Sequence, residues 1–516
     1  MDTTLVDALR AELQRETGQP VGLAETHISW VLLTPTLALK LKKPVRLPFL
    51  DFGSLESRRH FCEEELRLNR RFAPALYIDV APVCGTRDAP HIGGGGTPID
   101  YVVRMRRFAE SALLRNLLVS NALEPGLLDG FAKQLAGLHA QAQRAAPVSG
   151  FGAPDAIVRA ASDVLASLRA QVRGGEGDRT ASLAAIGAWI EEQGQALRMA
   201  WIARQQGGAV RECHGDLHLA NVVLVDGALT PFDCIEFDPA LRWIDVVSDI
   251  AFLTMDLKAH GHGELAFRFL DTWLQYSGDY AGLQVLRFYE VYRALVRAMA
   301  SGLAPGDPGG EKKGPDYLEC ARRLAAQPEE GARLMITHGL SGSGKSSIAG
   351  RLLCAAGAVR VRSDVERTRL FGLAPLEHSA AAGLDIYGAQ ATRRTFERLR
   401  ACARDALLAG YPVIVDAAFL RHAERQSFEA LATELRVPFS ILDCSAAPAT
   451  LRRRVAERDA AGTDASEAGL AVLERQLATH EPLDADERRA AIEVSTEGTV
   501  EVAQLLAQWR SAAFER

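Results

Sequence analysis

The chain has 516 residues, enough for two or three domains, and its 48% hydrophobic content is ample for their cores. With 59 basic and 65 acidic residues, its net charge of −6 gives no indication of a polyanionic partner. No apolar run reaches the ~18 residues of a membrane span, no signal peptide is recognisable, and the eight cysteines are scattered singly, so we expect a cytoplasmic protein with free thiols and no membrane partner.

The first half has the pattern of a small sheet followed by a mostly helical region. Strands are predicted at 28–34, 37–43, 99–108, 222–227 and 229–233, the first two forming a hairpin around Pro35. Helices are predicted at 61–72, across 127–205, where apolar residues recur every three or four positions, and in the stretch that runs to about 302.

The segment HGDLHLAN at 214–221 holds an aspartate and an asparagine five positions apart, and Asp233 follows in PFDCIEFD. Three such groups serve one chemistry, in which Asp216 accepts the proton of a substrate hydroxyl while Asn221 and Asp233 hold Mg²⁺ on the phosphates of ATP. A metal site of His214 and His218 with Asp216 is the alternative. Zinc needs a further ligand at a recognisable spacing, and the sequence offers none.

The pattern H-G-D-x-x-x-x-N resembles the signature of aminoglycoside-phosphotransferase-like kinases, relatives of protein kinases, over about 25–302. The resemblance implies an α+β protein-kinase-like fold, with a small sheet lobe and a helical lobe. It also implies that Lys40 is the phosphate-binding lysine, with Lys42 as the fallback, and that Glu65, or else Glu64, pairs with it. Asp249, in DVVSDIA, is implied as a structural support of the catalytic loop.

The loops of this half depart from the family pattern. No G-x-G-x-x-G lies between the first two predicted strands, only TPT, and the GGGG at 93–96 is predicted to be a loop elsewhere. Cys234 and Ile235, instead of Phe-Gly, follow the predicted metal ligand. No dense acidic stretch lies in 255–300 to receive a polycationic antibiotic, so aminoglycoside resistance is not predicted.

The clearest break in the chain is 301–314, rich in glycine, proline and charge. We therefore predict a first domain over 1–302, a linker over 303–328 and a second domain over 329–516. Beyond the break strands and helices alternate, which predicts an α/β domain with a parallel sheet covered on both faces. Its predicted strands are 333–340, 359–364, 412–419 and 439–444, and its predicted helices are 345–357, 389–409, 421–435 and one from 447.

The stretch GLSGSGKSS at 339–347 fits the P-loop pattern G-x-x-x-x-G-K-[ST] between a predicted strand and a predicted helix. Its glycines let backbone N–H groups close round a phosphate chain, and the helix directs its positive end at the same anion. Lys345 is expected to reach the β- and γ-phosphates, and Ser346 to ligate Mg²⁺. The residues predicted to bind the nucleotide here are Gly339, Ser341, Gly342, Ser343, Gly344, Lys345, Ser346 and Ser347.

Four further side chains indicate transfer of the phosphate instead of hydrolysis. Asp416 ends a strand and suits the metal, and Ala417 follows where a common ATPase has a glutamate that activates water. Asp364, at the tip of the preceding strand, can accept the proton of an attacking hydroxyl, although an N-cap is the alternative. Arg454 and Arg458, one helical turn apart, are expected to clamp the transferring phosphate, with a solvated basic face as the alternative.

These residues resemble the P-loop kinase group of gluconate kinases, zeta toxins and the 5′-kinase domain of polynucleotide kinases, over about 330–516. The resemblance implies that Asp364 is the substrate-side carboxylate and that 452–470 forms a mobile lid. With 24 basic and 25 acidic residues, 330–516 lacks the basic excess of a polynucleotide-binding domain, which favours a small hydroxylated substrate. The whole chain resembles bacterial proteins described as an aminoglycoside-phosphotransferase-like domain followed by a predicted P-loop kinase.

The sequence thus predicts two sites that use ATP and Mg²⁺, each transferring the γ-phosphate to a hydroxyl of a small molecule. Two alternatives stay open. The P-loop half can be a nucleic-acid 5′-hydroxyl kinase, or the first half can be a non-catalytic, ATP-binding regulatory module.

Overall fold

A computed structural model of the chain describes residues 3–47, 50–172, 177–303, 314–326, 331–374, 386, 388–461 and 468–512. Its contacts form two compact units: unit 1 comprises 1–157 and 202–253, and unit 2 comprises 158–201 and 254–516. Part of the predicted linker lies outside the described residues, and the boundaries at 302 and 329 stay a prediction. No described helix is long and apolar enough to cross a membrane.

Unit 1 is built on a six-stranded sheet of order β1-β2-β3-β8-β6-β7 with antiparallel pairing. Its strands are β1 (Gly22–Glu25), β2 (Ser29–Leu33), β3 (Leu37–Lys42), β6 (Tyr77–Gly85), β7 (Pro90–Ile92) and β8 (Asp100–Arg106). The hairpin predicted from the sequence is formed by β2 and β3, and the strand β1, which was not predicted, precedes it. The sequence signal for β1 is weak because all four of its residues are exposed. The turn between β1 and β2 also lacks glycine.

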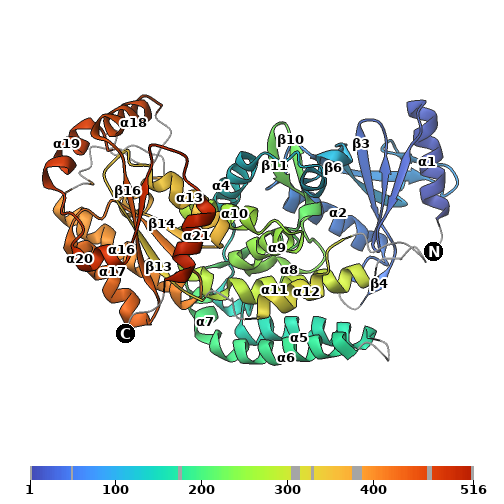
Figure 1. Ribbon diagram of the computed structural model, residues 1–516. Coiled ribbons are helices and arrows are strands. Elements are labelled where there is room, and N and C mark those ends of the chain that lie inside the picture. The colour runs from blue at the N-terminus through green and yellow to red at the C-terminus, as the bar shows by residue number, and fades with distance from the viewer. Residues whose placement is uncertain are drawn as a thin grey trace. The chain divides into compact units, whose positions relative to one another are not determined.

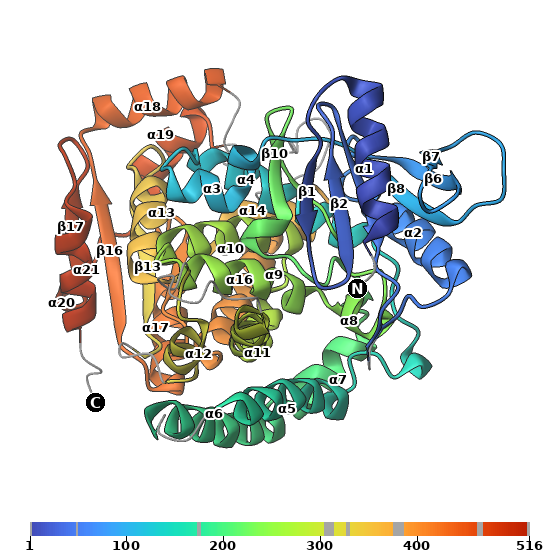
Figure 2. The same cartoon turned by 90° about the vertical axis from the view of Figure 1, so that its right-hand side faces the viewer.

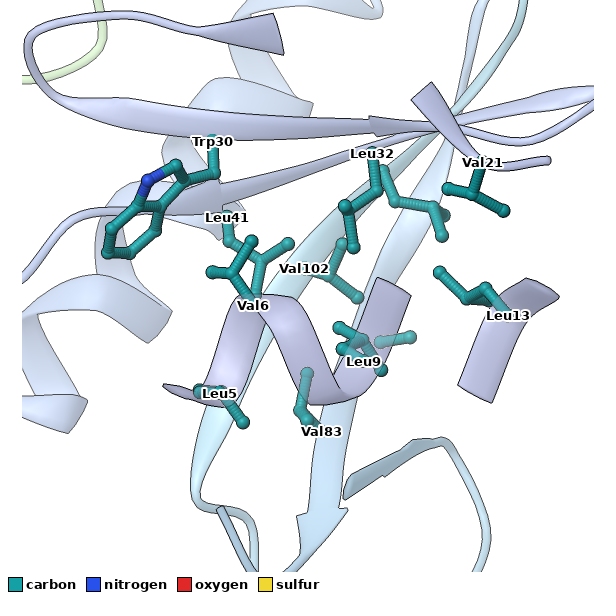
Figure 3. Packing of buried hydrophobic residues seen from close by; sticks show 12 residues of the cluster. Leu5, Val6, Leu9, Leu13, Val21, Trp30, Leu32, Leu41, Val83 and Val102 are labelled. Atoms are coloured by element: carbon teal, nitrogen blue, oxygen red, sulfur yellow. The ribbon is translucent and has the colours of Figure 1, made fainter. Parts of the chain in front are cut away.

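One face of this sheet is covered by α1 (Thr4–Thr17), whose apolar residues recur along one side of the helix. Figure 3 shows them packed on the strands, and the labelled cluster comprises Leu5, Val6, Leu9, Leu13, Val21, Trp30, Leu32, Leu41, Val83 and Val102. Leu39 and Leu41 face this cluster. Since side chains alternate along a strand, Lys40 and Lys42 point to the opposite face, where α2 (Leu55–Asn69) lies.

The rest of unit 1 holds the predicted catalytic loop between short strands. Two helices come first, α3 (Leu114–Val119) and α4 (Pro125–Gln141). Strand β9 (Val210–Glu212) pairs with β12 (Trp243–Asp245). Between these two strands lie the turn η3 (Leu219–Asn221), the hairpin of β10 (Val222–Val225) and β11 (Ala228–Pro231), and α8 (Pro239–Arg242). Helix α9 (Val246–Ala259) begins in unit 1 and ends in unit 2. The predicted kinase-like fold of the first half is confirmed.

Several helices of the predicted first domain group with unit 2. They are α6 (Gly177–Ala196), α10 (Gly263–Ser277), α11 (Leu283–Leu303) and parts of α5 (Pro154–Gln171) and α7 (Arg198–Gln206). Helix α12 (Tyr317–Ala325), in the predicted linker, also belongs to unit 2. Trp189 and Trp201 both pack on the ring of Phe288, which joins α6 and α7 to α11.

The second half forms a five-stranded parallel sheet of order β14-β15-β13-β16-β17. Its strands are β13 (Leu334–His338), β14 (Val359–Arg362), β15 (Val413–Asp416), β16 (Phe439–Ser445) and β17 (Ala491–Ser495). The parallel sheet is confirmed, and β17, an edge strand with a single buried residue, was not predicted.

Helices cover the sheet as Figure 1 and Figure 2 show. α13 (Lys345–Ala356) and α21 (Val502–Ser511) share an apolar cluster with β13, β15 and β16, while α16 (Ala389–Leu408) and α17 (His422–Leu435) also contact the strands. The remaining helices of this half are α14 (Ser363–Leu370), α18 (Pro448–Ala461), α19 (Leu470–Thr479) and α20 (Ala485–Arg489).

Candidate active sites

The centre of the unit 1 site is a buried glutamate shared by two lysines. Glu65, on α2, is fully buried. Its Oε1 accepts a hydrogen bond from Lys40 Nζ at 2.9 Å, and its Oε2 accepts one from Lys42 Nζ at 2.7 Å. Burial alone would raise the pKa of Glu65, but the two ammonium groups lower it overall. Glu64, the second choice from the sequence, pairs with Arg67 instead.

The two lysines differ in their second partner. Lys40 Nζ also donates to Asp233 Oδ1 at 2.5 Å, and the Asp233 side chain is 42% exposed. Lys42 instead pairs with the buried Glu236, which the sequence reading missed. The only signal for Glu236 was its place three residues after Asp233. Lys40 is therefore the lysine that reaches a predicted metal ligand, whereas Lys42 is enclosed in the core.

The catalytic-loop pair lies together as its spacing predicted. Asn221 Nδ2 donates to Asp216 Oδ2 at 2.9 Å and to the Asp216 carbonyl oxygen at 3.0 Å. This use of the amide nitrogen leaves the Asn221 amide oxygen as a potential metal ligand. The Asp216 side chain is 33% exposed, so an incoming hydroxyl can reach it. Gly215 has φ +87°, and a Cβ there would lie 2.7 Å from the Leu241 carbonyl oxygen, so this position requires glycine.

Asp249, at the first turn of α9, holds this loop from behind. Its carboxylate accepts hydrogen bonds from the backbone N–H of His214 at 3.1 Å and of Gly215 at 2.9 Å. Its Oδ2 also lies 3.1 Å from Nε2 of His139, a residue on α4 that the sequence reading did not single out. Burial would raise the pKa of Asp249, but these hydrogen bonds and the histidine lower it overall.

The two histidines of the loop have structural partners. His214 Nε2 donates to the Phe232 carbonyl oxygen at 2.9 Å, and its Nδ1 accepts from the Asp216 backbone N–H at 3.3 Å. Burial lowers the pKa of His214, which keeps the ring neutral. His218 Nδ1 accepts from the Ala220 N–H at 3.2 Å and thereby caps η3. The metal-pair alternative receives no support from this geometry, because both ring nitrogens of His214 are engaged.

Asp233 is held in an unusual backbone conformation, with φ +64°. Its N–H donates to the Tyr77 hydroxyl at 3.2 Å, and the next N–H, of Cys234, donates to Asn69 Oδ1 at 3.0 Å. Tyr77 and Asn69, which the sequence reading also missed, therefore fix the carboxylate in its position near Lys40. His214 connects this segment to the catalytic loop, since its ring bonds to Phe232 on one side and to Asp216 on the other.

In unit 2 the P-loop runs from β13 into α13 and requires its glycines. A Cβ on Gly339, at φ +134°, would lie 2.3 Å from the Cys444 carbonyl oxygen. A Cβ on Gly342, at φ +81°, would lie 2.8 Å from the Leu451 carbonyl oxygen. Gly344, at φ +83°, directly precedes the first residue of α13. The loop therefore presents backbone N–H groups at a helix N-terminus, as the motif predicted.

Lys345 and Ser346 lie at the start of α13. Lys345 Nζ donates to the Leu340 carbonyl oxygen at 2.8 Å and lies 3.4 Å from Ser343 Oγ. Burial lowers the pKa of Lys345, although the charges of Asp416 and Asp364 oppose that shift. Ser346 Oγ donates to Asp416 Oδ1 at 3.1 Å.

Ser341 and Ser347 are two further P-loop serines that the sequence predicted to bind the nucleotide. Ser347 is exposed, and the Ser341 N–H donates to the side-chain oxygen of Gln476 on α19 at 2.9 Å. The sequence reading did not single out Gln476, because nothing in its local pattern links it to the P-loop.

Asp364, the predicted acceptor-side carboxylate, lies on α14, and the predicted clamp of Arg454 and Arg458 lies on α18. Asp364 is the second residue of α14, and Arg362 occupies the N-cap position, so the N-cap alternative is wrong. Arg454 donates to Thr496 Oγ1 at 2.8 Å and to the Gly342 carbonyl oxygen at 3.3 Å, which ties the P-loop to the end of β17. Arg458 donates to the Ala468 carbonyl oxygen at 2.6 Å, and its charge acts on Lys345.

Both arginines are therefore engaged with neighbouring groups, which does not fit the alternative of a solvated basic face. Their role as a clamp stays a prediction. Part of the predicted lid at 452–470 lies outside the described residues.

The comparisons with known proteins divide the chain in two. Residues 51–289 match the family described as a phosphotransferase enzyme family, and residues 334–483 match one described as an AAA domain. Uncharacterized proteins of Mycobacterium tuberculosis and Mycobacterium bovis are 29% identical over 464 residues, which cover 88% of this chain and 90% of theirs.

Among solved structures, similarity is found to a gluconokinase from Sinorhizobium meliloti, with 16% identity and a TM-score of 0.26 over 35% of this chain and 90% of that one. A choline/ethanolamine kinase family protein from Mesorhizobium loti has 14% identity and a TM-score of 0.37 over 63% of this chain and 96% of that one. By its family matches, the chain joins a domain that matches a phosphotransferase family to a P-loop domain that matches the AAA-domain family, in the order in which its motifs placed them.

Proposed function

We propose that the chain is an ATP- and Mg²⁺-dependent phosphotransferase with two kinase domains, each of which transfers the γ-phosphate of ATP to a hydroxyl of a small molecule. The observation that carries this proposal is the cluster in unit 1, within a domain that matches a phosphotransferase family. There Asp233 pairs with Lys40, and Asp216 pairs with Asn221. The intact P-loop in the second matched domain supports the other site.

In unit 1 each side chain has a distinct task. Asp216 accepts the proton of the substrate hydroxyl, because it is the carboxylate of the catalytic loop and its side chain is partly exposed. Asn221 and Asp233 would hold Mg²⁺, which when bound neutralises charge on the phosphate oxygens. Lys40 orients the phosphates, while Asp249 keeps the catalytic loop in place through its two backbone hydrogen bonds.

In unit 2 the P-loop amides and Lys345 hold the phosphate chain, and Ser346 and Asp416 would hold Mg²⁺. The fit to that ion is supported by Asp416 Oδ2, which is buried and accepts no hydrogen bond from any residue in the described parts of the chain. All of these donor atoms are oxygens, as a hard cation requires. Asp364 accepts the proton of the acceptor hydroxyl, and Ala417 leaves no glutamate after Asp416 to activate water.

A small-molecule acceptor is supported by the near-equal count of 24 basic and 25 acidic residues in 330–516. The free state of all eight cysteines supports a reducing, cytoplasmic setting. The acceptor is tested with the full chain, γ-labelled ATP and either a pool of small metabolites or 5′-hydroxyl oligonucleotides at two salt concentrations. We expect label in small molecules only. Salt-sensitive labelling of the oligonucleotides would instead make the P-loop half a nucleic-acid kinase.

A second candidate function for unit 1 is regulation by bound ATP without turnover. It is favoured by the turn between β1 and β2, residues 26–28, which carries no glycine to cover the phosphates. In that case Asp216→Asn would leave every transfer activity intact, whereas a variant of Lys40 that loses ATP would change the activity of unit 2.

A further inference from the structure

Helix α10, which lies within the predicted first domain, packs on the P-loop sheet inside unit 2. Its Phe267 joins the apolar cluster beneath α13 and β15. At its C-terminal end, Arg398 donates to the Gly278 carbonyl oxygen at 2.9 Å, and Arg369 donates to the Tyr276 carbonyl oxygen at 3.4 Å. The P-loop site is thus built with a helix that lies outside its sequence family match, which covers 334–483.

Asp271, in the middle of α10, binds an arginine of the P-loop sheet. Arg360 on β14 donates from Nη2 to Asp271 Oδ2 at 2.7 Å and from Nε to Oδ1 at 3.4 Å. Asp271 is 6% exposed and Arg360 is 9% exposed. Burial opposes the charge of Arg360, but the carboxylates of Asp271 and Asp416 raise its pKa overall. The guanidinium therefore carries its charge directly behind the P-loop.

The third nitrogen of Arg360 faces the predicted metal ligands. Nη1 donates to the Ser346 carbonyl oxygen at 3.1 Å and lies 3.8 Å from Asp416 Oδ2, which is beyond hydrogen-bond distance. Arg362 Nε lies 3.7 Å from the same oxygen. Two guanidinium groups thus stand close to Asp416 Oδ2, and neither donates to it.

Both arginines are held by one face of α10. Arg362 Nη1 donates to the side-chain oxygen of Gln275 at 3.3 Å, and Gln275 Nε2 donates to Asp271 Oδ2 at 2.7 Å. Asp271 and Gln275 are four residues apart, so they lie on the same side of the helix. Asp271 is the only charged member of this pair, and its carboxylate accepts hydrogen bonds from two of the three guanidinium nitrogens of Arg360.

We propose that Asp271 is a positioning residue for the P-loop site: by binding Arg360 it keeps that guanidinium from moving closer and donating a hydrogen bond to Asp416 Oδ2, and so keeps the Asp416 carboxylate available to Mg²⁺. This inference rests on the proposed function of unit 2. Without the charge of Asp271, Asp416 is the remaining carboxylate beside the Arg360 guanidinium, 3.8 Å away. Two opposite charges that are buried at such a distance attract each other strongly. A guanidinium on Asp416 competes with the metal for the same oxygens.

The test follows Mg²⁺-dependent binding of a fluorescent ATP analogue to the full chain, counting only the part that Lys345→Ala removes. Asp271→Asn is expected to raise the Mg²⁺ concentration at half-saturation by about tenfold, the usual scale for a group that supports a metal ligand. Binding of the analogue without Mg²⁺ is expected to stay unchanged. Asp271→Asn combined with Arg360→Gln should return the Mg²⁺ midpoint toward that of the unsubstituted chain, because the competing guanidinium is gone.

The matched control is Tyr280→Phe, which removes another hydrogen bond to the same strand, from Tyr280 Oη to the Arg360 carbonyl oxygen at 3.3 Å, and leaves the guanidinium paired. Its midpoint should not move. An unchanged midpoint in Asp271→Asn, or an equal rise in the double variant, overturns this inference while the proposed function stands. If the unsubstituted chain has no Lys345-dependent binding, the proposed function of unit 2 is itself wrong and this inference falls with it.

Discussion

The contrast between Lys40 and Lys42 gives the sharpest prediction for unit 1. Lys42→Met would leave Glu236 as a buried carboxylate whose ion-pair partner among the described residues is gone. Breaking a buried pair by removing one member costs about 3–5 kcal/mol of unfolding free energy. Lys40→Met is milder, because Glu65 keeps Lys42 and the half-exposed Asp233 can turn to water. We expect it to cost roughly 2 kcal/mol, the scale of one charge-assisted hydrogen bond.

Activity should show the opposite order. Lys40→Met removes the group beside Asp233 and should abolish the transfer activity of unit 1, whereas folded Lys42→Met should retain part of it. Stability is measured by hydrogen exchange of α2 amides with mass spectrometry, where a loss of 3 kcal/mol lowers protection by roughly a hundredfold.

Arg59→Gln, which breaks an exposed pair with Glu63 on the same helix, serves as the control and should leave the protection of the α2 amides unchanged, because exposed ion pairs contribute little to stability. Equal losses of protection in both lysine variants would refute the division of roles. So would an Lys42→Met protein with full protection and no activity.

Further predictions follow from backbone and burial. The Cβ of Gly339→Ala would lie 2.3 Å from the Cys444 carbonyl oxygen, so this variant should lose about 1–3 kcal/mol of unfolding free energy and lower the melting temperature of unit 2. Gly498→Ala, where a Cβ meets open space, is the control and should leave that melting temperature unchanged. Asp249→Asn should cost about 1–3 kcal/mol and slow the transfer by unit 1, measured by urea denaturation and by label transfer, since an amide cannot replace the charge that accepts two backbone N–H groups. Because burial lowers the pKa of His214 below its ordinary 6.5, the unfolded chain binds a proton there that the folded chain does not, so stability falls as pH drops below 6.5. His214→Gln should flatten that slope by up to about 1.4 kcal/mol per pH unit, and identical slopes in urea denaturation would contradict this.

The features predicted well from sequence depend on short spacings. The P-loop needs glycines whose positive φ and close contacts leave no room for a side chain, so its pattern is local and specific. The same holds for HGDLHLAN, where Gly215 and the bond between Asp216 and Asn221 lie within one short loop. Alternation along β3 likewise placed Lys40 and Lys42 on one face.

The features that were missed depend on pairs far apart in the chain. Asp271 and Arg360 are separated by 89 positions, and Lys42 and Glu236 by 194, so no local pattern connects them. A periodicity of apolar residues shows which face of an element is buried but does not say which charged group meets another there. The exposed strand β1 was missed for a related reason, since it has no buried face to produce a pattern.

The central claim is that each unit carries its own phosphoryl-transfer site. It is tested most directly by incubating the full chain with γ-labelled ATP, Mg²⁺ and a metabolite pool, and comparing the labelled products of the unsubstituted protein, Asp216→Asn, Lys345→Ala and the double variant. We predict that each single variant loses a different product and that the double variant loses both. Retention of all products by Asp216→Asn, or of any product by the double variant, would contradict the account.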